Sequence, residues 1–426
     1  MEMKKLTTRY YLCIDLRTFY ASVESVERGL DPMVTKLVVA DPDRSGGTVC
    51  LAVTTAMKKL GVKNRCRVRE IPKNIEYIMA EPRMKLYIDY AAEIYGIYLK
   101  NISKDDIFVY SVDEAFLDVT NYLSLYHITP KELGQKLMDE IYNELGLRSA
   151  CGIGTNLYLT KVALDITAKH SPDSIGFLDE ETYRKTLWNH RPITDFWRIG
   201  EGTARRLARL GIYTMEGIAK ANEDLLYKVF GVDAELLIDH ANGLETATIA
   251  DIKAYRPKTK SFTSGQVLPE DYTFSNGEIV VKEMMDELCF QMVEKGYVTK
   301  SVTLHVGYSY KTNLEPAHGT FSVDSETNAP AVLIPEIAKL YRDIVDFRYP
   351  IRRIHIYCNN VVREDHRQMS FFDNNEKIEK STTIQKTMLD IKKKYGKNAV
   401  FKGIDLHDSA TTRQRNRKIG GHKSGE

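Results

Sequence analysis

The stretch Ser111-Val112-Asp113-Glu114-Ala115-Phe116-Leu117-Asp118 decides the fold, because it sets two adjacent acids between two apolar segments. Alternating residues over 107–111 and 115–119 predict a β-hairpin. Another apolar run, residues 10–15, predicts a strand that ends on a third acid, Asp15. Adjacent carboxylates cannot both be buried without a counter-charge. Clustered carboxylate oxygens suit Mg²⁺ bound to a substrate phosphate, so the three acids predict such a site.

The elements around the hairpin are predicted in the order strand, helix, hairpin, helix, strand. The outer strands are expected at 10–15 and 148–153, and the helices at 19–28, 87–99, 131–145 and 156–168. An insertion after the first helix is expected to hold strands 47–53 and 76–80 around a helix at 54–60. This is the βαββαβ pattern of a ferredoxin-like sheet, in which Asp15 can lie beside the hairpin. The alternative is that Asp113 and Glu114 are ordinary turn residues.

Composition sets the class of the protein. The 426 residues leave room for roughly three domains, and 43% of them are hydrophobic, which is enough to build cores. No apolar run reaches the roughly 18 residues of a membrane helix, and the N-terminus is too polar for a signal peptide. Six scattered cysteines without a Cys-x-x-Cys motif indicate a reducing, cytoplasmic location with neither a disulfide framework nor a zinc site.

Charge is nearly balanced overall but uneven along the chain. The net charge is +2, whereas residues 376–426 hold 13 Lys and Arg against 6 Asp and Glu. Lys253, Arg256, Lys258 and Lys260 form a second basic stretch. Such stretches can bind phosphate groups, and the alternative is that they are solvated surface charges.

Residues 171–243 change character and predict several short helices. The segment 196–207 has an apolar-Gly-x-Gly turn, with Gly200 and Gly202, that opens a basic helix. This pattern resembles a helix-hairpin-helix, in which backbone N–H groups hold a DNA phosphate without reading sequence. Glu201 departs from the usual apolar residue, and a plain helical turn is the alternative.

A second α+β domain is expected after a tether at 244–258. The predicted elements are strands 301–308 and 353–358 and helices 277–295 and 330–344. We interpret His305 and His355 as exposed strand residues rather than metal ligands.

Three motifs together resemble the Y-family translesion DNA polymerases. Residues 15–24 and 111–118 are similar to the two metal-binding motifs of that family, and Gly152-Ile153-Gly154-Thr155-Asn156, followed by Lys161, is similar to the third. The similarity runs from about residue 10 to 360. Residues 61–63 with 69–72, and the closing segment 415–422, resemble the bacterial UmuC-like branch.

The resemblance implies an α+β multidomain chain shaped as a right-hand polymerase, with a ferredoxin-like palm, small fingers, a helical thumb with a helix-hairpin-helix, and an α+β little finger. The implied bounds are 1–18 and 80–170 for the palm, 19–79 for the fingers, 171–243 for the thumb, 244–258 for a linker, 259–362 for the little finger and 363–426 for a C-terminal tail.

The resemblance also implies the roles of the site residues. Asp15, Asp113, Glu114 and the backbone carbonyl of Leu16 would hold two Mg²⁺ ions. The implied nucleotide contacts are Thr18, Phe19, Tyr20, Thr55, Lys58 and Lys161, and the implied DNA contacts are Gly200, Gly202, Thr203, Arg205, Arg352 and Arg353. Tyr20 has the position of the steric gate that excludes ribonucleotides, although a core aromatic is the alternative reading. Many members carry Tyr and Arg where this chain has Thr55 and Lys58, and Lys lacks the planar fork of Arg.

The segment Gln368-Met369-Ser370-Phe371-Phe372 resembles the sliding-clamp-binding peptide of bacterial polymerases. In the competing interpretation, Phe371 and Phe372 cap the preceding domain. Residues 377–426 are expected to form a partly ordered basic arm. The implied partners are primed DNA, dNTPs and the clamp, with a recombinase filament or accessory subunits in addition, and the chain is expected to be a monomer.

The expected activity is template-directed, error-prone DNA synthesis past damage, in the SOS response and without a proofreading exonuclease. A nucleotide cyclase shares a palm-like sheet with paired acids, but it has no reason to carry a helix-hairpin-helix or a clamp peptide. A degenerate polymerase that only binds DNA is the other alternative, and the presence of all three acids and Lys161 argues against it.

Overall fold

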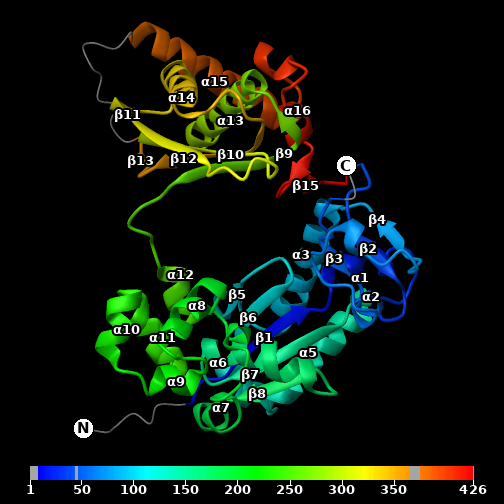
Figure 1. Cartoon of the computed structure of the whole chain (residues 1–426). Coiled ribbons are helices and arrows are strands. Elements are labelled where there is room, and N and C mark those ends of the chain that lie inside the picture. The colour runs from blue at the N-terminus through cyan, green and yellow to red at the C-terminus, as the bar shows by residue number, and fades with distance from the viewer. Residues whose placement is uncertain (1–7, 44–46, 365–374, 426) are drawn as a thin grey trace. The chain divides into compact units, whose positions relative to one another are not determined.

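The computed structural model describes residues 8–43, 47–364 and 375–425. The chain forms two compact units, one that ends at Tyr255 and one that begins at Arg256 (Figure 1). Among the residues described, no helix has the length and apolar character needed to cross a membrane. Each unit has its own hydrophobic core and is described separately.

The first unit is built on a five-stranded sheet in the order β5-β6-β1-β7-β8. Its strands are β1 (Tyr11–Leu16), β5 (Ile107–Val109), β6 (Glu114–Asp118), β7 (Ser149–Gly154) and β8 (Ile175–Leu178). β1 lies in the centre, antiparallel to both β6 and β7, as the βαββαβ pattern predicts. β8 extends the sheet as a parallel neighbour of β7, although its residues were assigned to the following helical segment. A segment of four residues between turns is too short to be predicted as a strand.

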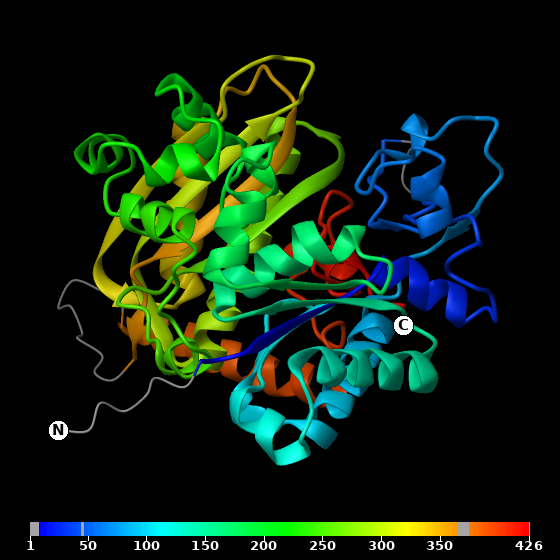
Figure 2. The same ribbon diagram turned by 90° about the horizontal axis from the view of Figure 1, so that it is seen from below.

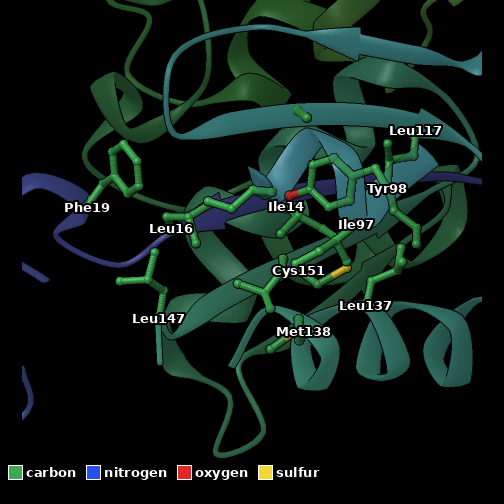
Figure 3. Close-up of a cluster of buried hydrophobic side chains, with 14 of the residues drawn as sticks. Ile14, Leu16, Phe19, Ile97, Tyr98, Leu117, Leu137, Met138, Leu147 and Cys151 are labelled. Atoms are coloured by element: carbon green, nitrogen blue, oxygen red, sulfur yellow. The ribbon is translucent and has the colours of Figure 1, made fainter. Parts of the chain in front are cut away.

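Helices cover both faces of this sheet, which explains why β1 is a continuous apolar run. α3 (Met84–Asn101) and α5 (Pro130–Leu145) pack on the face that carries Leu12 and Ile14 (Figure 3). Tyr11 and Cys13 point to the opposite face, where α6 (Leu157–Val162) lies. Figure 2 shows helices on both sides of this sheet. Each fully buried Leu or Ile contributes roughly 1.5–3 kcal/mol.

Two glycines let α6 lie directly on β7. A Cβ atom at Gly152 would stand 2.2 Å from the carbonyl oxygen of Thr160, and one at Gly154 would stand 2.4 Å from the nitrogen of the same residue. After α6 the chain continues as a π-helical turn (Ala163–Thr167) and a 3₁₀ turn (Ala168–His170) rather than as the single helix expected over 156–168. π-helical turns occur frequently at functional sites.

A small three-stranded sheet, in the order β3-β2-β4, forms the insertion. Its elements and the helix before it are α1 (Phe19–Val26), β2 (Leu37–Val39), β3 (Ala52–Val53), α2 (Thr55–Lys59) and β4 (Ile78–Ala80). Val38, Cys50 and Met57 form a separate core there. β2 is a three-residue apolar segment that the sequence pattern did not reveal.

Short helices complete the first unit. They are α4 (Thr120–Tyr126), α7 (Glu180–Leu187), α8 (Glu201–Arg209), α9 (Met215–Ala219), α10 (Glu223–Phe230), α11 (Asp233–Ala241) and α12 (Ile249–Ala254). The prediction of a tether over 244–258 is wrong for its first part, because α12 packs on the sheet. Thr248 and Asp251 form its capping box, and Ile249 is buried with Tyr11 and Phe116. Lys253 donates to two backbone carbonyls of the same unit.

The second unit has an antiparallel sheet in the order β11-β10-β12-β9, and α13 and α14 cover one face (Figure 1). The elements are β9 (Phe262–Tyr272), α13 (Phe274–Lys295), β10 (Tyr297–Tyr308), β11 (Ala317–Thr327), α14 (Pro330–Ile344), β12 (Ile351–Asn359) and β13 (Val362–Arg363). The two predicted strands and both predicted helices are confirmed. β9 and β11 were not predicted, because β9 contains Gly and Pro and β11 is mostly polar.

The C-terminal segment is folded onto the second unit rather than forming a partly ordered arm. It consists of α15 (Asn375–Tyr395), α16 (Thr412–Arg415) and the hairpin β14 (Lys418–Ile419) with β15 (His422–Lys423). Thr382, Gln385 and Met388 are buried, at the three-residue spacing of one helix face. Gln385 and Lys402 both donate to Asp286 of α13, at 3.0 and 2.6 Å. Because this buried face includes the polar residues Thr382 and Gln385, no apolar period marked it in the sequence.

A buried carboxylate on α13, Glu283, joins the same segment to the second unit. Its oxygens accept from the backbone N–H groups of Thr411 and Thr412, at 2.8 and 3.1 Å, and from both hydroxyls. Because only 1% of Glu283 is exposed, the carboxylate depends on these donors.

We expect Glu283→Ala to destabilise the C-terminal segment by about 2–4 kcal/mol, because it leaves buried donors unsatisfied. Hydrogen exchange over 399–424 should accelerate accordingly. Glu294→Ala is the control, since Glu294 is on the same helix but makes only an exposed ion pair with Lys393, worth less than about 1 kcal/mol. Equal protection in both variants would contradict the role of Glu283.

Candidate active site

Three acidic residues lie in one region, where β1 pairs with β6 and with the turn before it. Asp15 lies opposite Glu114 in the strand register, and the N–H of Leu16 donates to the carbonyl oxygen of Asp113 at 2.9 Å. Since side chains alternate along a strand, Asp15 and Cys13 share the face on which α6 lies. The sequence prediction that Asp15 lies beside the hairpin is therefore confirmed.

The turn before β6 is fixed by its own hydrogen bonds. The N–H groups of Tyr110 and Ser111 both donate to the carbonyl of Glu114, at 2.9 and 3.0 Å. The Ser111 hydroxyl donates to Oδ1 of Asp113 at 2.6 Å. Glu114 is the first residue of β6, whereas Asp113 lies in the turn, and these hydrogen bonds hold the backbone that presents both carboxylates.

Lys161 of α6 supplies the counter-charge that two adjacent acids require. Its Nζ lies 2.8 Å from the Glu114 carboxylate and 3.2 Å from that of Asp165. Only 9% of the Lys161 side chain is exposed. Burial alone would lower the pKa of Lys161, but the two carboxylates outweigh it and hold this pKa above its ordinary value. The Cys13 thiol also donates to Glu114, at 3.1 Å.

The pKa of Asp15 is raised by its burial close to the other two acids. Burial, with the negative charges of Asp113 and Glu114, raises the pKa of Asp15 to about 7. The positive charges of Lys161 and Lys169 act in the opposite direction. Such a group of acids fits a divalent cation, which would remove the repulsion and supply the missing positive charge.

The carboxylates at β1 and β6 are less tightly grouped than one other set of acids. Within the described ranges, Asp41, Asp43 and Glu81 are the acids whose oxygens all lie within 4.8 Å of one another. That set is largely exposed, and we assign it no role. At β1 and β6, Glu114 is instead bonded to Lys161.

The start of α1 lies directly after β1 and Asp15. Thr18 has φ 49° and ψ 43°, a left-handed conformation that is strained for a β-branched residue. Its carbonyl accepts the N–H of Ser22, so the amides of Phe19 and Tyr20 precede the first hydrogen bond of the helix. Arg17, the residue before Thr18, donates to the Ser174 hydroxyl at 2.6 Å.

Tyr20 borders the carboxylates and packs on α3. Its ring stacks on that of Tyr87, with centroids 4.6 Å apart and planes at 20°. Burial, with the negative charge of Asp113, raises the pKa of Tyr20. The structure thus brings Tyr20 into the electrostatic range of Asp113.

Two lysines approach Asp15 from different elements. Lys58 of α2 comes from the insertion: burial lowers its pKa, and the negative charge of Asp15 opposes that shift. Lys169, in the 3₁₀ turn after α6, pairs with Asp165 at 3.2 Å and was missed in the sequence. The four-residue spacing of Lys161, Asp165 and Lys169 was the available signal. For Thr55, the structure gives its position at the start of α2.

The helix-hairpin-helix residues lie at the start of α8. Gly200 caps this helix, and at both Gly200 and Gly202 an added Cβ would meet nothing within 4 Å. The backbone of this turn is therefore open to a ligand. Thr203 and Arg205 follow in the first turns of α8, and Arg205 donates to the carbonyl of Glu201.

The remaining predicted DNA contacts lie on β12 of the second unit. Arg353 is exposed, and Arg352 lies 3.7 Å from Asp271. His305 and His355 are paired in register on β10 and β12, and the ring of His305 also stacks on His318. None of these histidines belongs to a group of possible metal ligands in the part of the chain described. The clamp-peptide residues Gln368, Met369, Phe371 and Phe372 lie outside the described residues.

Comparisons with known proteins agree with this geometry. The model of the impB/mucB/samB family matches residues 14–165, and that of its C-terminal domain matches residues 259–371. The chain is 30% identical to the putative UV-damage repair protein UvrX of Bacillus subtilis (strain 168), over the full length of both. It is 28% identical to DNA polymerase IV 2 of the same organism, over 96% of this chain and 97% of that protein.

Among solved structures, the Y-family DNA polymerase chimera Dbh-Dpo4(243-245)-Dbh matches with a TM-score of 0.65 and 20% identity. The match covers 83% of this chain and 99% of that one. This likeness confirms the expected fold class of palm, fingers, thumb and little finger. With the two family models, it places the chain in the impB/mucB/samB family, that of the Y-family translesion DNA polymerases.

Proposed function

We propose that this polymerase adds deoxynucleotides to a primer opposite damaged template by phosphoryl transfer at Asp15, Asp113 and Glu114. The observation that carries the proposal is the meeting of these three carboxylates at the β1–β6 pair, with Lys161 as counter-charge. The raised pKa of Asp15 supports it, because it marks a site that lacks positive charge.

The residues that would hold two Mg²⁺ ions are the three carboxylates and the backbone carbonyl of Leu16. Ions bound there would ease deprotonation of the primer 3′-hydroxyl and neutralise the triphosphate. The chain itself would supply orientation: the strand pairing holds Asp15 and Glu114 opposite each other, and Ser111 holds Asp113. Lys161 would orient the Glu114 carboxylate through their 2.8 Å contact, and its contact with the triphosphate remains a prediction.

The nucleotide would lie along the start of α1. Amides at Thr18, Phe19 and Tyr20, at the positive end of a helix, suit triphosphate oxygens. Lys58 and Thr55 would approach the same phosphates from the fingers insertion, which is favoured by the interaction of Lys58 with Asp15. The Tyr20 ring would lie under the sugar and exclude a ribose 2′-hydroxyl.

Contacts to DNA would be independent of sequence. The open turn at Gly200 and Gly202, with Thr203 and Arg205, would bind backbone phosphates, and Arg352 and Arg353 would do so from the second unit. The residues Gln368, Met369, Phe371 and Phe372 would dock on a sliding clamp. We further propose that the chain acts as a monomer in the cytoplasm, in the SOS response, with a recombinase filament or accessory subunits as further partners.

Cation binding should depend on pH, because a proton and a cation compete for Asp15. A pKa of about 7 means that a proton occupies this carboxylate at lower pH. In the cation-free protein, the raised pKa contributes stability at low pH that is lost as the pH rises through 7. Affinity for Mn²⁺ should therefore be about tenfold weaker near pH 6 than near pH 8. Calorimetric titration would measure it, and Asp15→Asn should remove the dependence. An equal affinity at both values would contradict the assignment of Asp15.

Extension past an abasic site tests the proposed function. With Mg²⁺, dNTPs and a 5′-labelled primer, the wild-type chain should insert opposite the lesion and continue, with few additions per encounter when trap DNA is present. A mismatched primer end should not be shortened, since no proofreading is expected. Chain termination at the lesion, with normal synthesis on intact template, would remove the translesion part of the proposal.

A further inference from the structure

The Tyr20 ring rests on a second aromatic ring that no expected role explains. Tyr87 lies in α3, is fully buried and stacks nearly parallel to Tyr20, with ring centroids 4.6 Å apart. Tyr20 itself is half-buried. A stacked ring blocks movement of its neighbour in that direction, and such pairs add to the stability gained from buried area. The side of Tyr20 that faces Tyr87 is therefore closed.

Tyr87 is held in turn by a buried carboxylate, that of Glu24. Its hydroxyl donates to Oε1 of Glu24 at 2.8 Å. Nε and Nη2 of Arg83 donate to the two oxygens of the same carboxylate, both at 2.9 Å. Arg28 donates to the Glu24 backbone carbonyl at 2.6 Å and to its carboxylate. The Glu24 side chain is fully buried, so its carboxylate depends on these donors.

The charge of Glu24 is retained despite burial. Burial would raise the pKa of Glu24, but hydrogen bonds from Arg83, Arg28 and Tyr87 outweigh it and lower this pKa below its ordinary value. An ionised Glu24 is a strong acceptor for the Tyr87 hydroxyl. The anchor of the ring is therefore fixed at any pH at which a polymerase works.

The residues that make these contacts are spaced so that they share one face of each helix. Tyr20 and Glu24 are four residues apart on α1, and Arg83 and Tyr87 are four residues apart at the start of α3. Residues at this spacing share a helix face. The ring stack and the ion pair therefore connect the same two helix faces, and Tyr20 cannot tilt toward α3 without displacing Tyr87 from its bond to Glu24.

We propose that Tyr87 is a positioning residue that, with Glu24 and Arg83, fixes the Tyr20 ring and so sets the discrimination between deoxyribonucleotides and ribonucleotides. This inference rests on the proposed function, in which Tyr20 lies under the sugar. A ring that excludes a hydroxyl by contact works only if it cannot tilt. Tyr87 itself does not touch the nucleotide.

The test is the ratio of kcat/KM for ATP to that for dATP, opposite template thymine, in the full chain. Tyr87→Leu removes the ring and should raise this ratio about tenfold while dATP use changes little. Tyr87→Phe keeps the ring, and should restore most of the wild-type ratio. Tyr90→Leu is the matched control, because Tyr90 also joins α3 to α1, through Glu27 at 2.8 Å, whereas the ring contacts of Tyr20 within the described residues are with Phe19 and Tyr87.

A double variant separates positioning from general loss of structure. In a Tyr20→Ala background, Tyr87→Leu should leave the ratio unchanged, because no ring remains to position. The proposal is overturned if Tyr87→Leu lowers the use of both nucleotides equally, or if it still shifts the ratio in that background. If Tyr20→Ala alone does not raise the ratio, the steric-gate part of the proposed function fails together with this inference. If Tyr20→Ala raises the ratio but Tyr87→Leu does not, the positioning role of Tyr87 is wrong and the steric-gate role of Tyr20 still stands.

Discussion

Asp113→Ala is expected to lower kcat/KM for nucleotide incorporation by about a thousandfold or more. The variant removes one of the three carboxylates proposed to hold the divalent cations. It should not damage the fold, since Asp113 is one of the charges that raise the pKa of Asp15, and its loss relieves repulsion. Single-turnover incorporation with saturating DNA would measure the effect on chemistry.

The control for this variant is Asp118→Ala. Asp118 is the last residue of β6, the strand that follows Asp113, and it accepts from Thr120 and pairs with Arg9 at 3.6 Å. This change should cost some local stability but leave incorporation near the wild-type rate. DNA affinity, measured by fluorescence anisotropy, should stay close to wild type in both variants. Incorporation by Asp113→Ala within a few fold of wild type would show that the carboxylate assignment is wrong.

Tyr20→Ala is expected to raise the use of ribonucleotides relative to deoxyribonucleotides by about a hundredfold, the range available to exclusion of one small group. The reason is that the half-buried ring, backed by Tyr87, would no longer fill the space of a 2′-hydroxyl. Steady-state kcat/KM for each dNTP and its matching rNTP gives the ratio.

Tyr20→Phe is the control for this prediction, because it keeps the ring and removes only the hydroxyl. It should retain the wild-type discrimination. If Tyr20→Phe lost as much selectivity as Tyr20→Ala, the hydroxyl rather than the bulk of the ring would carry it, and the steric account would be contradicted.

The centre of the fold could be predicted because its signals are local. The apolar run before Asp15 and the alternation around Asp113 and Glu114 specify strands, and their order restricts the sheet to a ferredoxin-like arrangement. Strands with weak patterns were not predictable in this way. β8 is four residues long, and β11 has few apolar residues because one face of its sheet is open.

The electrostatics of the site could be predicted only in part. The requirement for a counter-charge followed from two adjacent acids, but the sequence assigned Lys161 to the triphosphate rather than to Glu114. That contact depends on α6 lying directly on β7, which two glycines permit. Lys169, whose charge acts on Asp15, follows a π-helical turn that the sequence pattern did not predict. Interactions of this kind depend on tertiary packing and leave no mark in local periodicity.

The folded state of the C-terminal segment was not predicted from the sequence. Its excess of positive charge suggested an arm, because the buried face of α15 is partly polar and gives no apolar period in the sequence. The buried acids Glu283 and Asp286 on α13 were the counterpart signal. Buried carboxylates on a helix need donors from elsewhere in the chain, and the C-terminal segment supplies them.

The most direct test of the central claim is single-nucleotide incorporation on four primed templates that differ only in the templating base. Each template is combined with each dNTP in turn, with Mg²⁺ and with EDTA. The account predicts that the wild-type chain extends every primer, prefers the complementary nucleotide and stops in EDTA. Addition that ignores the template, or no addition even when the sliding clamp is supplied, would contradict template-directed synthesis by this chain.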